Sequence, residues 1–136
     1  MDARLELERI RGGRAQPPPP GYDLDRVEYP GGAPVLEHAR EVMTDVLSGR
    51  EPPDWFVERC IDDSEVKTCE VRRWSLRAWR FWLDAENRRW WWWSARALPG
   101  GGVEVEVLVR SKPWLRGALD WLFQVSREAV EAGGPG

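Results

Sequence analysis

The stretch NRRWWWWSARALPGGGVEVEVLVR, residues 87–110, predicts a β-hairpin. In its second half every other residue is a valine, so four valines share one face of a strand. In the connection, Pro99 suits a helical turn position and Gly101 suits the left-handed position of a three-residue turn. That turn pairs Leu98 with Gly102 and fixes the register by counting. The four valines are Val103, Val105, Val107 and Val109.

Counting back from the turn gives a register that also matches charges. Arg96 falls opposite Glu104, as a correct antiparallel register should place them. The same count puts Trp91 and Trp93 on the valine face. Because that face is the more apolar one, we expect both rings in the core.

The other two tryptophans of the run then lie on the opposite face of the hairpin. A patch of exposed rings there exceeds what monomers usually leave in water. Tryptophan and arginine are also the residues that dominate binding hot spots. We therefore predict a binding surface on this face, extended by the preceding strand; its members are Trp79, Phe81, Trp90, Trp92, Arg96, Leu108 and Arg110.

Three different covers would account for this aromatic face. Residues 1–30 would fold back across it, a second copy of the chain would pair with it in a homodimer, or another partner or ligand would bind it. The sequence does not choose among the three. The second and third make the face functional.

The segment VRRWSLRAWRFWLD, residues 71–84, predicts a further strand, because tryptophan, phenylalanine and arginine are dense and the turn-like DAEN follows. A helix over residues 75–88 competes with this interpretation, since Leu76, Trp79 and Leu83 also have helical spacing. We favour the strand. The register of its hairpin with residues 88–98 stays open.

Helical spacing of apolar residues predicts three helices, over 34–48, 52–61 and 113–131. The fold class is therefore α+β, with two layers: an antiparallel sheet of three or four strands in a meander, and two N-terminal helices and one C-terminal helix on one face. We expect residues 33–132 to form this domain. Residues 1–32 form an extended segment with a proline-rich linker at 15–21, and residues 133–136 form a flexible tail.

Composition limits the classes of function. The 136 residues are 42% hydrophobic and 32% charged, as in a globular domain. No apolar run exceeds four residues and the N-terminus lacks a signal pattern, so we expect a cytoplasmic protein without a membrane segment. His38 is the single histidine, and Cys60 and Cys69 are too few to complete a metal set. We predict no enzyme, no metal and no cofactor.

The charges are unevenly distributed along the chain. Residues 33–64 hold eight carboxylates against three arginines, whereas residues 65–98 hold eight basic residues against four acidic ones. The acidic helices can steer the domain toward a basic partner. The candidate residues for such a contact are Glu37, Glu41, Asp45, Asp54 and Glu58.

These patterns favour a non-enzymatic protein-binding module, such as a toxin-neutralising immunity protein or an adaptor. The partner is another protein or a second copy of the chain. Two alternatives use the same aromatic face. One is single-stranded nucleic acid, which stacks bases on aromatic rings but fits poorly with a net charge of −3. The other is a small molecule in an aromatic cavity.

Overall fold

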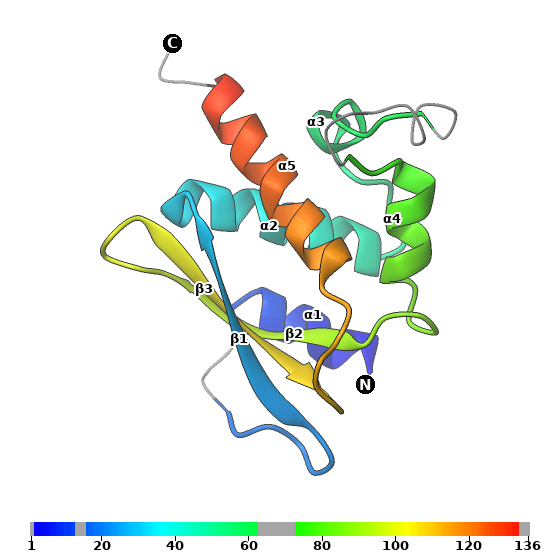
Figure 1. Cartoon of the computed structure of the whole chain (residues 1–136), viewed down its shortest axis with the longest axis vertical. Coiled ribbons are helices and arrows are strands. Elements are labelled where there is room, and N and C mark those ends of the chain that lie inside the picture. The colour runs from blue at the N-terminus through cyan, green and yellow to red at the C-terminus, as the bar shows by residue number, and fades with distance from the viewer. Residues whose placement is uncertain (1, 13–15, 63–72, 134–136) are drawn as a thin grey trace.

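The computed structural model of the chain describes residues 2–12, 16–62 and 73–133 (Figure 1). Within these ranges the chain forms an α+β fold with one three-stranded antiparallel sheet. The sheet has three strands and not four. The elements are α1 (Ala3–Ile10), β1 (Asp23–Pro30), α2 (Gly32–Leu47), α3 (Asp54–Val57), α4 (Leu76–Leu83), β2 (Trp90–Ala97), β3 (Gly102–Val109) and α5 (Gly117–Gly133).

The hairpin of β2 and β3 has the predicted turn. The amide of Leu98 donates to the carbonyl of Gly102 (2.8 Å), and Gly101 adopts a left-handed φ of 93°. Next to the turn the register also agrees with the prediction, and Arg96 lies opposite Glu104. The turn chemistry therefore fixed the pairing over its first four residues.

Farther from the turn the predicted register is wrong, because a bulge between Trp92 and Ser94 inserts one extra residue in β2. Trp92 lies opposite Val107 and Trp90 opposite Val109, so these two rings join the valine face. Trp91 pairs with Leu108 on the other face. A one-residue shift exchanges the two faces of a strand. The prediction is therefore wrong for Trp90, Trp91 and Trp92, whereas Trp93, expected in the core, is buried.

The predicted strand at 71–84 is also wrong where the structure describes it. Residues 76–83 form the helix α4, which is the competing interpretation in shortened form. Ser75 caps it, because its side chain accepts a hydrogen bond from the amide of Ala78 (3.1 Å). The helix buries Trp79 and Leu83 on one side. The cap and the helical spacing of these two apolar residues outweighed the strand propensity of the residues between them.

The N-terminal segment, predicted as extended over 1–32, contains two regular elements. Residues 3–10 form α1, and β1 pairs with β3 along its whole length, so the strand order is β1-β3-β2 and not that of a meander. The hairpin strands β2 and β3 therefore lie beside a strand from the N-terminal segment. Residues 76–83 are helical, so they do not form the predicted hairpin with β2.

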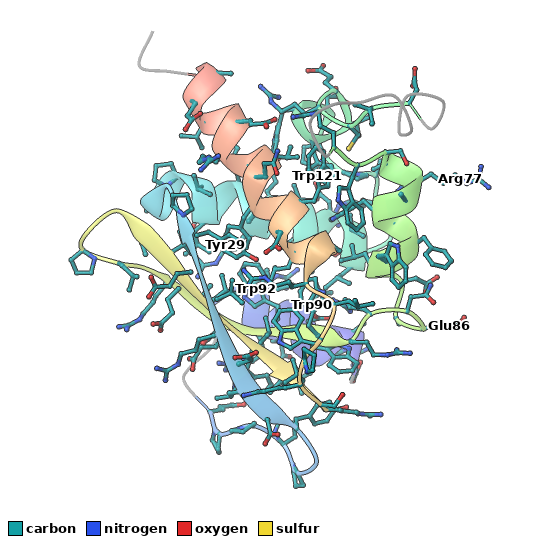
Figure 2. All side chains as sticks on the ribbon, viewed as in Figure 1. Tyr29, Arg77, Glu86, Trp90, Trp92 and Trp121 are labelled. Atoms are coloured by element: carbon teal, nitrogen blue, oxygen red, sulfur yellow. The ribbon has the colours of Figure 1, made fainter. Side chains whose placement is uncertain are left out.

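The core lies between the valine face of the sheet and the helices α2 and α5, which cross above it (Figure 1). This agrees with the predicted packing of helices on one face. Trp90 and Trp92 lie between α5 and the sheet (Figure 2), and the ring of Trp92 stacks on Phe123 with centroids 6.0 Å apart. Each buried indole removes about 150–250 Å² from water. No helix in the described ranges is both long and apolar enough to cross a membrane.

Candidate functional site

The predicted sheet-face site does not form as one surface. Trp79, Trp90 and Trp92 are buried in the core, and Leu108 is buried on the opposite side of the sheet. These side chains cannot contact a partner in this structure. The exposed members of the predicted set are separated: Phe81 lies on α4, whereas Arg96 and Arg110 lie on and beside the sheet. The bulge and the helical α4 are the two causes of this separation.

The N-terminal segment partly covers the outer face of the sheet, opposite the valines. The ring of Tyr22 meets Trp91 edge to face, with centroids 5.4 Å apart. The guanidinium of Arg110 lies over both rings and donates to the hydroxyl of Tyr22 (2.9 Å). The first of the three predicted covers, residues 1–30, therefore accounts for this part of the face.

The rest of the outer face consists largely of paired charges. Arg96 pairs with Glu104 and Arg26 with Glu106, each at 3.2 Å. The hydroxyl of Ser94 also donates to Glu106 (2.8 Å). Exposed pairs of this kind contribute little stability.

A buried ion pair holds α1 against the free edge of β2. Both terminal nitrogens of Arg88 donate to the carboxylate of Glu6 at 2.7 Å, and the two side chains are only 3% and 1% exposed. Glu6 also accepts the amide of Trp92 (2.8 Å), and Arg9 donates to the carbonyl of Trp93 (2.8 Å). Side chains of α1 thus satisfy backbone groups that an edge strand otherwise leaves open.

This ion pair was missed by the sequence analysis. Nothing in the sequence marks Glu6, which lies between two leucines in a weakly patterned segment. Arg88 is one of two arginines before the tryptophan run and differs from Arg89 only in structure, since Arg88 is buried and Arg89 is exposed. Charge pairs between segments far apart in sequence give no local signal.

The acidic candidates divide into paired and unpaired residues. Glu37 pairs with Arg40 (2.7 Å) and Asp45 with Arg50 (3.0 Å). Among the described residues no cation pairs with the remaining three, which are exposed. Two of these, Asp54 and Glu58, are in or next to α3, and the third, Glu41, is on α2.

A hollowed surface lies elsewhere, between α4 and the start of α5. This α4–α5 cavity has a volume of about 540 Å³, within the range typical of ligand sites. The residues that line it are Trp74, Trp82, Asn87, Arg88, Arg89, Leu115, Arg116, Gly117, Ala118, Asp120, Trp121 and Gln124.

Exposed apolar side chains border this cavity. Phe81, Trp82 and Leu115 are 55%, 39% and 63% exposed, and we call these three the aromatic rim. Trp82 and Leu115 line the cavity itself, and Phe81 meets Trp82 edge to face with centroids 5.2 Å apart. Three large apolar side chains thus gather at one exposed site. The sequence analysis had named only one of them.

A polar chain connects the cavity with the core. The hydroxyl of Tyr29 donates to Asp120 (2.5 Å), which also accepts from Arg116 (3.0 Å), and the ring of Tyr29 stacks on Phe123. Burial and, next, the hydrogen bond to Asp120 raise the pKa of Tyr29 well above its usual value. Tyr29 therefore stays protonated and acts as a fixed donor.

The side chains of His38 and Cys60 each contact a backbone carbonyl four residues earlier. Nδ1 of His38 lies 2.8 Å from the carbonyl of Pro34, and its ring meets Trp55 edge to face. Burial raises the pKa of the Cys60 thiol, which disfavours the thiolate. Cys69 lies outside the described residues. Within the described ranges no three or more Cys, His, Asp or Glu side chains form a group that could hold a metal ion.

Comparison of the chain with known protein families, with curated proteins and with solved structures finds no match. The functional argument therefore rests on the geometry of this chain alone.

Proposed function

We propose that this protein is a non-enzymatic binding module that contacts a protein partner through the aromatic rim. The observation that carries the proposal is the exposure of Phe81, Trp82 and Leu115 beside a single cavity. Aromatic side chains around a depression are typical of binding hot spots, in which a partner side chain fills the pocket. A toxin-neutralising immunity protein and an adaptor are two kinds of protein that would work in this way.

The rim replaces the sheet face as the proposed contact surface. Trp90 and Trp92 are buried, so they are not available to a protein or to the bases of a nucleic acid. The acidic residues Glu41, Asp54 and Glu58 keep the secondary role of steering, because they are exposed and no cation in the described part of the chain pairs with them.

The test is site-specific photo-crosslinking in the source cells. A photoreactive phenylalanine analogue replaces Phe81 or Leu115, and the matched control carries it at Arg96 on the outer face of the sheet. We expect one protein to crosslink from positions 81 and 115 and not from 96. Crosslinks to a second copy of the chain would identify a homodimer through the rim.

Competition makes this test specific. Excess protein without the photoreactive analogue should suppress the crosslink. Excess Trp82→Arg variant should not, because this variant lacks the central ring of the rim. A partner that crosslinks from position 96 but not from 81 or 115 would contradict the proposal.

A further inference from the structure

The walls of the α4–α5 cavity are suited to a planar ring. Three indole side chains line it, from the segment before α4, from α4 itself and from α5: Trp74, Trp82 and Trp121. Trp74 packs tightly on the start of α5, because a Cβ at Gly117 would come within 2.8 Å of its ring. Flat aromatic walls favour stacked or edge-on contact with another ring.

The charges at the cavity favour one negative group. Three guanidinium groups line it, and carboxylates pair with two of them: Glu6 with Arg88, and Asp120 with Arg116. Arg89 donates to the carbonyl of Glu86 (3.2 Å), but among the described residues no carboxylate pairs with it. The remaining charge is therefore a single positive one, which favours a monoanion.

Arg88, which lines the cavity, also keeps one buried donor without a partner in the described part of the chain. Nε of Arg88 is buried and has no hydrogen-bond partner among the described residues, although both terminal nitrogens are paired. Leaving such a donor unpaired is costly. The first turn of α5 also borders the cavity, through Gly117 and Ala118, and the amide end of a helix favours negative charge.

From the indole walls and the charges at the cavity we infer that the α4–α5 cavity binds a planar aromatic carboxylate. The ring lies among the indoles of Trp74, Trp82 and Trp121, and the carboxylate faces the guanidiniums of Arg88 and Arg89. This inference goes beyond the proposed protein contact, because it assigns a small ligand to the cavity that Trp82 and Leu115 of the rim line.

The test measures the binding of 2-naphthoate, the probe, to the full chain by ligand-observed saturation-transfer NMR. The neutral 2-naphthamide and the doubly charged 2-naphthyl phosphate keep the ring and change the charge. We expect 2-naphthoate to bind at least about tenfold more tightly than the amide, since charged hydrogen bonds are the stronger ones, and more tightly than the phosphate.

Two variants locate the binding. Arg89→Gln and Trp82→Ala, both at exposed positions, should each weaken 2-naphthoate about tenfold, whereas the control Arg96→Gln should leave it unchanged. Equal binding of the acid and the amide, tighter binding of the phosphate, or no binding at millimolar concentration would overturn the inference. The protein contact is tested independently by crosslinking from position 81. A failure of 2-naphthoate to bind would therefore not contradict the proposed protein contact.

Discussion

Tryptophan serves two different purposes in two regions of this molecule. On β2, Trp90 and Trp92 are buried between the sheet and α5. At the α4–α5 cavity, Trp82 is 39% exposed and borders open space beside Phe81 and Leu115. The comparison shows that a run of tryptophans does not by itself mark a binding surface. What matters is whether another element closes over the rings.

The largest expected difference between the two regions is in stability. Trp92→Ala should lower the free energy of unfolding by about 3–5 kcal/mol, because it leaves a cavity under α5. Trp82→Ala should change it by less than about 1 kcal/mol, since the ring is partly exposed. Urea unfolding of both variants measures the difference. Equal losses of unfolding free energy in the two variants would contradict the distinction between a buried Trp92 and a partly exposed Trp82.

A second prediction concerns the edge of the closed region. Glu6→Gln should destabilise the fold by about 3 kcal/mol, because it leaves Arg88 buried and without its counter-charge. The double variant Glu6→Gln with Arg88→Met should lose less than the sum of the two single variants. Additive losses in this urea-unfolding cycle would show that the two side chains do not act as a pair.

A third prediction concerns Tyr29, which joins the two regions. Tyr29→Phe removes the hydrogen bond to Asp120 and should cost about 1–2 kcal/mol at neutral pH. Because the pKa of Tyr29 is raised in the folded state, the unfolded chain loses this proton first as the pH rises above about 10. Tyr29 thus makes stability fall with rising pH there.

The measurement is the free energy of unfolding from pH 8 to pH 11 for both proteins. We expect the wild type to lose its advantage over Tyr29→Phe across the upper half of this range. A constant difference between them would argue that the hydroxyl does not titrate differently on folding.

A smaller effect is expected at the ion pair beside Trp74. Arg73 donates twice to Glu128 (3.0 Å each) and lies next to Trp74, and this pairing lowers the pKa of Glu128. Glu128→Gln should therefore cost about 1 kcal/mol at pH 7, allowing for partial exposure. The cost should disappear as the pH falls through the lowered pKa, where the carboxylate becomes protonated. Thermal unfolding at pH 7 and pH 3 checks this; a cost unchanged at pH 3 would contradict it.

The sequence predicted the parts of the fold that depend on local chemistry. The turn at Pro99–Gly101 and the helical spacing of α2 each carry their own signal, and both elements formed. The four consecutive tryptophans carry no such signal, because identical neighbours satisfy either register. A single bulged residue at Trp93 therefore exchanged the faces of Trp90, Trp91 and Trp92.

The candidate site was less predictable, because it depends on contacts between distant segments. Residues 74–89 and the start of α5 meet only in the folded chain, and Trp82 and Leu115 have no common motif. For α4, helical spacing and strand propensity favoured different structures. The Ser75 cap was the local signal for the helix.

The most direct test of the contrast between the two regions is hydroxyl-radical footprinting of the free protein, read residue by residue by mass spectrometry. We predict rapid modification of Phe81, Trp82 and Leu115, and protection of Trp90 and Trp92 until the protein unfolds. Modification of Trp92 as fast as that of Trp82 in the folded protein would show that Trp92 is accessible to solvent and not buried. It would restore the sheet as the candidate binding face.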